Sequence, residues 1–219
     1  MRTAYFAFVL GMAQLAFGQT VDTADRVVAL QPAPHGALEK VLSWVEPAPS
    51  MEKGRPERVS EFLMSTAGPI PLLGEAAGAG VGQWANWPKE WGQGWGAFGK
   101  RFGSNLAYNG IRQTVTYGGS LALGEDTRYF ASRDSGWWAR TRHALVSTFT
   151  ARHADGRDTF SISGTGGVIA ASALSSIWGP ASWKGPGNIA ENAGISFLST
   201  AGSNVVREFL PDILHRPRK

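Results

Sequence analysis

The side chains of this chain that could do acid–base or metal chemistry are scattered along the sequence. The four histidines are His35, His143, His153 and His215, and none of them lies in an HExxH pattern or a similar ligand spacing. The absence of cysteine excludes disulfides and thiolate metal sites. The sequence therefore predicts neither a metal site nor a cofactor.

One catalytic arrangement stays open, a periplasmic hydrolase that uses His143 with Asp126 or Asp134. No G-x-S-x-G nucleophile elbow accompanies these residues. Asp126 also belongs to the run Glu125–Phe130, where carboxylates stand beside an arginine and two aromatic residues. We expect these acids to cap backbone groups and to pair with Arg128. We therefore favour a non-enzymatic function over the hydrolase.

The clearest secondary-structure pattern in the sequence lies between Trp84 and Gly103. Its aromatic residues recur at spacings of three and four, as on one face of an α-helix, and a row of glycines runs beside them. A glycine-rich loop with accidental periodicity is the alternative. Because each glycine costs a helix about 1 kcal/mol relative to alanine, we predict close packing on another backbone. The packing residues predicted here and in later helices are Gly92, Gly96, Gly99, Gly103, Gly167, Ala171 and Gly194.

Aromatic and basic residues indicate a surface that contacts lipid or a partner protein. Trp84 and Trp87 stand at the entrance of the predicted helix and are expected at an interface, whereas Trp95, between two glycines, is expected in the core. Basic residues beside tryptophans can also meet lipid phosphates, although a solvated face paired with acids is the alternative. The predicted contact residues are Trp84, Trp87, Trp91, Lys100, Arg101, Arg140 and Arg142.

The second half of the chain predicts further helices. We expect one from Ser135 to about His153, followed by a turn and another helix, although residues 148–151 and 159–162 alternate like a β-hairpin. The segment from Phe160 to Trp183 has no charged residue and many small ones, and residues 188–209 form a last apolar helix. Whether these two helices span a membrane or form a soluble core stays open.

The N-terminal residues Met1–Gly18 have the features of a secretory signal peptide, with Gln19 as the first residue of the mature chain. Residues 19–71 are rich in proline and predict a loosely ordered arm, residues 72–213 a helical domain, and residues 214–219 a basic tail. We expect a protein exported to the periplasm or outer membrane of a bacterium.

The charge of the chain is mildly basic, with 21 Lys and Arg against 17 Asp and Glu. This balance argues against a nucleic-acid partner, and so does export. The partners we expect are membrane lipids or another envelope protein, and a homo-oligomer is possible.

Several short runs of the chain resemble a recurrent family of uncharacterised exported bacterial proteins, and the similarity covers roughly residues 84–215. The resemblance implies a single unit over that span and implies no activity, fold or site. The runs that carry it are Trp91-Gly-Gln-Gly-Trp-Gly, Glu125-Asp-x-Arg-Tyr-Phe130, Trp138-x-Arg140 with His143-Ala-Leu145, and Asn204 to Phe209-Leu-Pro-Asp-Ile213.

Together these patterns predict a mainly α fold, a compact bundle of about four to five small-residue-rich helices behind a Pro-rich N-terminal arm. The expected function is that of a non-enzymatic cell-envelope protein that associates with a membrane surface or a membrane-embedded partner. The alternatives are the hydrolase and a small outer-membrane β-barrel. A barrel needs about eight strands of alternating residues, and barely two such segments can be found.

Overall fold

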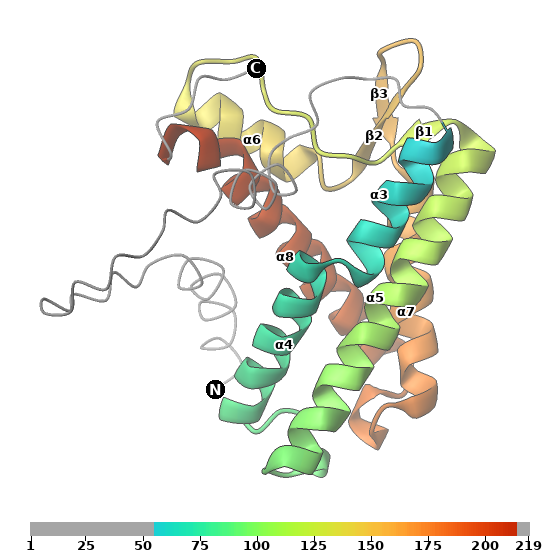
Figure 1. Ribbon diagram of the computed structural model, residues 1–219, viewed down its shortest axis with the longest axis vertical. Helices are drawn as coiled ribbons and strands as arrows, with labels where there is room; N and C mark the ends of the chain where they lie inside the picture. Colours follow the sequence, from blue (N-terminus) through green and yellow to red (C-terminus); the bar gives the residue numbers. More distant parts are fainter. Residues whose placement is uncertain (1–54, 214–219) are drawn as a thin grey trace, which may run out of the picture. The chain divides into compact units, whose positions relative to one another are not determined.

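The computed structural model of the protein describes residues 55–213, which are mainly helical (Figure 1). These residues form two compact units. The bundle unit contains residues 55–128 and 149–198, and the α6 unit contains residues 129–148 and 199–213. We predicted one helical domain over residues 72–213. The predicted signal peptide, most of the predicted arm and the basic tail lie outside the described residues.

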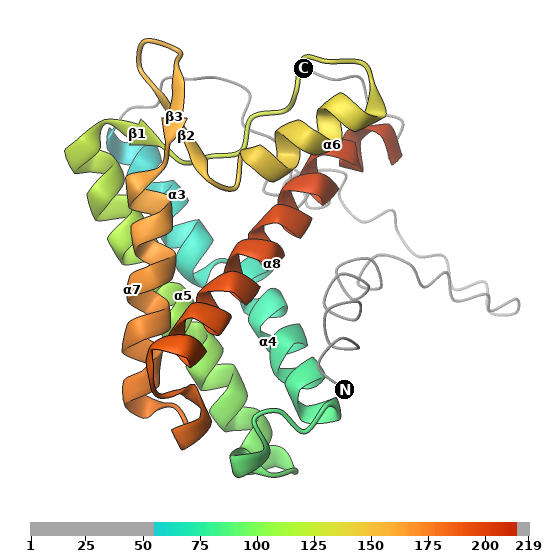
Figure 2. The same ribbon diagram turned by 180° about the vertical axis from the view of Figure 1, so that it is seen from behind.

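The bundle unit is built around helix α5, against which α3, α4 and α7 pack (Figures 1 and 2). A three-stranded antiparallel sheet in the order β1-β2-β3 belongs to the same unit. Its elements are α3 (Arg55–Ala67), α4 (Pro69–Trp84), the 3₁₀ helix η1 (Lys89–Trp91), α5 (Trp95–Leu123), β1 (Glu125–Asp126), β2 (Thr150–His153), β3 (Asp158–Phe160), α7 (Ile162–Trp178), the 3₁₀ helix η2 (Ala181–Trp183) and the first part of α8 (Pro186–Ile213).

The α6 unit contains α6 (Trp137–Val146), the segment that precedes it, and the C-terminal part of α8. Helix α8 continues through Pro211 to Ile213, whereas we expected the last helix to end at residue 209. Helix α3 lies in residues that we assigned to the Pro-rich arm, near the position where a helix over residues 57–65 is possible from the sequence, and it packs on α4 and α5.

The helix predicted from Trp84 to Gly103 is wrong in its first half. Helix α4 ends at Trp84, and α5 begins only at Trp95. Between them, Gly92 and Gly94 have φ values of +69° and +95°. These conformations are incompatible with a right-handed helix and suit glycine. These glycines thus lie in a loop between two helices. The three-and-four spacing of the aromatic residues extends through this loop although the loop is not helical.

The β-hairpin that we ranked second is the structure that forms. Helix α6 ends at Val146, and β2 pairs with β3 through Thr150 opposite Phe160 and Arg152 opposite Asp158. Gly156, in the turn between the strands, has a φ of +81°. The alternating residues on both sides of this turn therefore satisfy their backbone hydrogen bonds in a ladder, and the predicted helix does not reach His153.

Glu125 closes the N-terminal end of α7, as we expected of an acid in this run. Its carboxylate accepts hydrogen bonds from the backbone amides of Ile162 and Ser163 at 3.0 Å each, and from the Ser163 hydroxyl. Burial by itself raises the pKa of Glu125, but these hydrogen bonds outweigh it and the pKa is lowered. A carboxylate at this position satisfies free N–H groups and interacts favourably with the helix dipole.

Among residues 55–213, no other backbone lies against the glycine row of the Trp84–Gly103 stretch. A Cβ placed at Gly96, Gly99 or Gly103 would meet no described atom within 4 Å, and the same holds for Gly92 and Gly194. The packing role predicted for these glycines is therefore corrected. Helix α5 buries a different face, which carries Ala97, Arg101, Ser104 and Asn109.

Close approach of two helices occurs instead at Gly167 on α7. A Cβ at this position would overlap Oγ1 of Thr116 and lie 2.8 Å from the carbonyl oxygen of Arg112, both on α5. Ala171, one turn further along α7, is completely buried. These two small residues, which we did predict as packing positions, allow α7 and α5 to lie close together.

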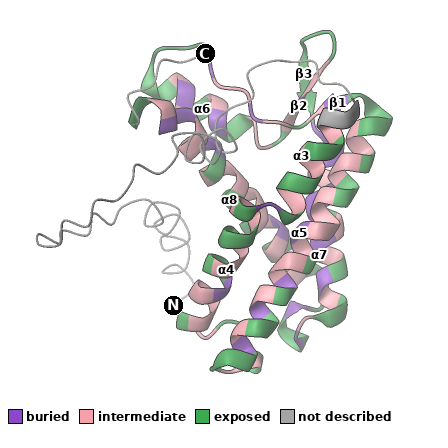
Figure 3. Ribbon diagram, in the orientation of Figure 1, coloured by how far each residue is buried: buried purple, intermediate pink, exposed green. Residues whose placement is uncertain are grey.

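The residues that α7 buries are small or carry hydroxyl groups, apart from Val168, whereas most of its large apolar residues are exposed (Figure 3). Ser163, Ser172 and Ser175 are buried together with Gly167 and Ala171. A helix of a water-soluble bundle normally buries its large apolar side chains. None of the described helices is both long and apolar enough to cross a membrane. The large apolar side chains that α7 exposes are Ile162, Ile169, Leu174, Ile177 and, in part, Trp178.

Candidate functional site

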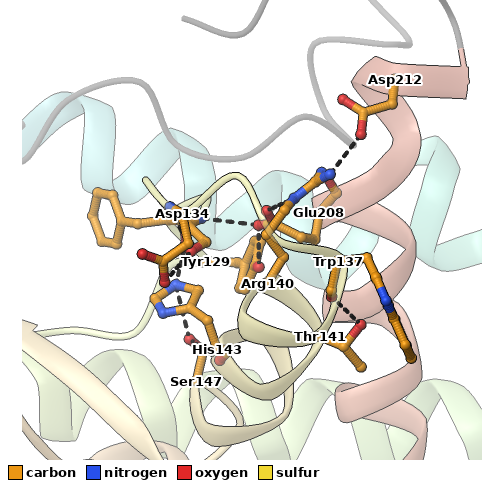
Figure 4. Close-up of polar contacts among 11 residues, drawn as sticks. Tyr129, Asp134, Trp137, Arg140, Thr141, His143, Ser147, Glu208 and Asp212 are labelled. Atoms are coloured by element: carbon orange, nitrogen blue, oxygen red, sulfur yellow. Dashed lines mark hydrogen bonds and ion pairs between the residues drawn. The ribbon is translucent and has the colours of Figure 1, made fainter.

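A buried cluster of polar side chains organises the α6 unit around Glu208 (Figure 4). Glu208 lies on α8, and only 1% of its surface is exposed. Its carboxylate accepts hydrogen bonds from the Tyr129 hydroxyl at 2.6 Å, the Ser132 amide at 2.9 Å and Arg140 Nε at 2.8 Å. One carboxylate therefore ties α6 and the segment before it to α8.

Arg140 is fully engaged by the same cluster. Its Nη1 donates to the Asp212 carboxylate at 2.6 Å, and its Nη2 donates to the Glu208 carbonyl oxygen at 2.7 Å. The guanidinium also lies over the ring of Phe209, 4.1 Å from the centroid. Burial by itself lowers the pKa of Arg140, but the hydrogen bonds to Glu208 and Asp212 outweigh it and the pKa is raised. The side chain is thus a permanent cation with internal partners.

This geometry corrects the role that we predicted for Arg140. We expected it to contact lipid or a partner, but it is only 5% exposed and its guanidinium is bound to α8. Arg142, two residues further along α6, points to solvent and is exposed. The signal that separates them is helical phase, since residues two apart lie on different faces of a helix.

His143 has a structural role in the same unit. Its Nε2 lies 2.9 Å from the carbonyl oxygen of Phe130. Because a carbonyl only accepts, Nε2 carries the proton in this hydrogen bond. The hydroxyl of Ser147 is 3.4 Å from Nε2 and donates to the His143 carbonyl oxygen at 2.8 Å. This nitrogen is therefore not placed to act as a base toward that serine.

The two acids proposed as partners of His143 are also engaged elsewhere. Asp126 accepts from Arg128 Nε at 2.9 Å and from Nη2 at 2.6 Å, which confirms the predicted pairing in this turn. Asp134 accepts from the Ser132 hydroxyl at 3.3 Å. Within residues 55–213, no hydrogen bond or ion pair joins His143 to either acid. The described contacts thus do not assemble the hydrolase arrangement.

Tryptophans gather at one end of the bundle unit, where α4 ends, α5 begins and α7 leads into η2 (Figures 1 and 2). Six of the nine tryptophans of the chain lie in these elements or in the loop between α4 and α5. We call this region the tryptophan end. Its tryptophans are Trp84, Trp87, Trp91, Trp95, Trp178 and Trp183.

Trp183 is the centre of the interior part of the tryptophan end. Its ring centroid is 5.5 Å from that of Trp87 and 5.2 Å from that of Trp91, and the side chain is only 9% exposed. Trp178 donates from Nε1 to the Ser104 hydroxyl on α5 at 3.0 Å. These indoles join α7 and η2 to the loop and to α5, so Trp91 is mainly a packing residue.

Trp84 and Trp95 form the exterior part of the tryptophan end, with 72% and 89% of their surfaces exposed. Exposure agrees with the interface position expected for Trp84, whereas the core position expected for Trp95 is wrong. Trp95 is the first residue of α5, and its ring contacts that of Phe98 edge-on at a centroid distance of 6.1 Å. Lys100 is exposed on the same helix.

Arg101, which we predicted as a contact residue for lipid or a partner, holds the loop between α4 and α5 from the interior. It is 3% exposed. Its guanidinium donates to the carbonyl oxygens of Trp87, Pro88 and Gly92, at 2.8, 3.2 and 2.9 Å, and to Gln83 Oε1 at 2.5 Å. The side chain thus supplies donors to loop carbonyls, of which that of Pro88 also accepts from the Trp91 amide.

The chain was compared with known proteins. No protein-family model, no curated protein and no solved structure matches it. Within the described range, His, Asp and Glu side chains do not form any group of three or more that could hold a metal ion. The tryptophan end is therefore our candidate functional site, since the buried polar clusters are engaged in structural contacts.

Sequence reasoning missed Glu208, Tyr129 and Trp183 as organising residues. Glu208 follows Arg207 at the end of the apolar part of α8, and a carboxylate that becomes buried there generally needs a buried partner. That signal identifies the acid but not its partner, because Arg140 is 68 residues away in the sequence. Trp183 follows a loop, where the sequence shows no period that indicates burial.

A pH dependence of stability is expected from Glu75 on α4. Burial raises its pKa from 4.5 to about 7, and the positive charge of Arg112 on α5 lowers it in part. Between these values the folded protein binds more protons at Glu75 than the unfolded chain, so the free energy of unfolding decreases as the pH rises through this window.

We expect Glu75→Gln to remove this contribution and to stabilise the protein most at a pH above 7. Urea denaturation of both proteins at about pH 5 and about pH 8 measures it, with Glu191→Gln as an exposed control. An equal pH dependence in wild type and Glu75→Gln would show that Glu75 remains charged when folded.

Proposed function

We propose that this protein is a non-enzymatic, membrane-associated protein of the bacterial cell envelope that docks its tryptophan end on the lipid surface. The observation that carries the proposal is the exposure of two indoles at one end of the bundle unit, 72% for Trp84 and 89% for Trp95. Tryptophan prefers the headgroup zone of a bilayer, where its ring is buried and its N–H stays hydrated.

The charges next to these indoles support the same orientation. Lys89 on η1 and Lys100 on α5 are exposed, and each basic residue near an anionic surface contributes about 1 kcal/mol. Glu90 is also exposed at this end. Its pKa is lowered by hydrogen bonds from its own backbone amide and from Ser182, so it stays charged and offsets one lysine. The net charge of these three exposed side chains is therefore positive, as binding to anionic headgroups requires.

The apolar side chains that α7 exposes also support contact between the bundle unit and an apolar environment. Ile162 and Ile177 stand near opposite ends of this helix with 60% and 73% of their surfaces exposed. Apart from Val168, the buried residues of α7 are serine, glycine and alanine, which favour close packing of helices in lipid. A membrane-embedded partner protein would offer the same kind of surface as acyl chains.

The export part of this proposal rests on the predicted signal peptide, which lies outside the described residues. The non-enzymatic part is supported by the contacts of Glu125, Glu208, Arg140 and His143. Each of these side chains closes a helix end or joins two segments of its own unit. None of these four side chains needs a substrate to complete its hydrogen bonds.

The test is vesicle co-sedimentation of Trp84→Ala/Trp95→Ala with vesicles that contain phosphatidylglycerol. Because both indoles are exposed, we expect the melting temperature to change little and binding to fall about tenfold or more. The matched control is Trp137→Ala/Trp138→Ala, which removes two exposed tryptophans from the α6 unit.

Equal vesicle binding by wild type and a folded Trp84→Ala/Trp95→Ala protein would overturn the proposal. An equal loss in the control pair would also contradict it, because the tryptophan end would then have no special part in binding.

A further inference from the structure

The tryptophan end contains a small, partly open cavity of about 30 Å³. Three indoles and a proline form its apolar walls, and an arginine and an asparagine supply polar groups. Two glycines also line the cavity, and because they have no side chain they leave space beside these groups. The lining residues are Gly78, Gly82, Trp87, Pro88, Trp91, Arg101, Asn105 and Trp183.

Arg101 lines this cavity, and its guanidinium is a buried cation with neutral hydrogen-bond partners. All four of its hydrogen-bond acceptors are backbone carbonyl or side-chain amide oxygens. None of the ion pairs among the described residues includes Arg101. Burial lowers its pKa, which is the effect of a charge removed from water without an opposite charge.

Trp183, which lines the same cavity, carries a second donor. The Nε1–H group of Trp183 is buried and has no hydrogen-bond acceptor among the described residues. Buried donors without a partner are uncommon because the lost hydration is not replaced. Two residues that line one cavity thus carry a buried cation and an N–H group without an acceptor, and both of these groups favour an anionic oxygen. The exposed carboxylate of Glu90 is bound to Ser182 and does not line the cavity.

We propose that this cavity binds one anionic oxygen of a phosphate group, supplied by a phospholipid headgroup where the tryptophan end meets the membrane. Its volume suits a single oxygen-sized occupant, so the remainder of the phosphate would lie outside the opening. Guanidinium and phosphate form strong charge-assisted hydrogen bonds. The inference rests on the proposed membrane function and adds the chemistry of the lipid group that is recognised.

The variant that tests the proposal is Trp183→Phe, which removes the N–H donor and keeps an aromatic ring. The control is Trp178→Phe, whose indole N–H donates to Ser104 and does not line the cavity. Full-length proteins are sedimented with vesicles of phosphatidylcholine and phosphatidylglycerol, with and without inorganic phosphate as a competitor. Binding of inorganic phosphate alone is measured by calorimetry.

We expect Trp183→Phe to bind these vesicles and inorganic phosphate about tenfold more weakly than wild type, and Trp178→Phe to bind as wild type does. Inorganic phosphate should displace wild type from the vesicles. Unchanged vesicle and phosphate binding by folded Trp183→Phe would overturn the cavity proposal, even where Trp84→Ala/Trp95→Ala still supports membrane docking.

The two proposals fail in different ways. Wild type that binds inorganic phosphate through Trp183 but does not sediment with vesicles would support an anion site and refute its lipid source. Wild type that sediments with vesicles but shows no phosphate competition and no effect of Trp183→Phe would leave membrane docking in place and refute the cavity site. A gain in binding from Trp183→Phe would also refute it.

Discussion

Replacing Glu208 with alanine is expected to destabilise the α6 unit by about 3–5 kcal/mol. The change leaves the buried guanidinium of Arg140 without its principal counterion and removes the acceptor of the Tyr129 hydroxyl and the Ser132 amide. The loss of one partner of a buried ion pair has effects of this size because the remaining charge stays desolvated. Hydrogen exchange of the α6 backbone amides, measured in the full-length protein, reports the change in this unit.

Asp212→Ala is the matched control for this prediction. Asp212 also binds Arg140, but 43% of its side-chain surface is exposed, so solvent replaces much of the lost interaction. We expect a destabilisation of at most about 1 kcal/mol. Similar exchange rates in the two variants would show that Glu208 is not the organising residue of this cluster.

The combination of Glu208→Ala with Arg140→Ala refines the test. Because the two side chains are joined by a hydrogen-bonded ion pair at 2.8 Å, their effects should not add. We expect the double variant to lose less stability than the sum of the single variants, since no buried charge remains unpaired.

Gly167→Leu is expected to cause the second large loss of stability, at the upper end of the range of about 1–3 kcal/mol that overpacking typically costs. The new Cβ would lie 2.8 Å from the backbone carbonyl oxygen of Arg112, and this atom cannot move without α5. Helices α5 and α7 must therefore separate. Thermal denaturation followed by circular dichroism measures the effect.

Gly166→Leu is the control at the neighbouring position, where a Cβ meets no described atom within 4 Å. We expect no loss and a gain of up to about 1 kcal/mol, because leucine forms helix more readily than glycine. Opposite signs at adjacent residues would identify packing against α5 as the cause. A stabilising Gly167→Leu would contradict the close approach of the two helices.

Several elements could be predicted from local sequence patterns. The charge-free segment after Phe160 forms α7, and the helical period after Trp95 continues as α5. The role of Glu125 as a cap and the pairing of Asp126 with Arg128 also followed from their spacing. These features depend on residues close in the chain or on a simple fit between an acid and a helix end, so the sequence contains most of the information.

Features that depend on backbone conformation within a repeat were mispredicted. The spacing of Trp84, Trp87, Trp91 and Trp95 fits one helix, but the positive φ values of Gly92 and Gly94 place a loop there. A glycine is compatible with a helix and with a left-handed turn, and the choice depends on whether loop carbonyls find donors. Arg101 supplies those donors from the next helix.

The sequence by itself determined that this protein is mainly helical, that its helices are lined by small residues, and that tryptophan is concentrated before α5. Only the tertiary structure decided which small residues face a neighbour and which tryptophans face solvent. Gly96 and Gly167 both stand in rows of small residues at helical spacing. A Cβ at Gly96 would meet no described atom within 4 Å, whereas a Cβ at Gly167 would overlap α5. The physical reason is that a periodic pattern gives the angular positions of side chains around a helix, whereas burial depends on where other segments pack, and those contacts join residues such as Arg140 and Glu208 far apart in the chain.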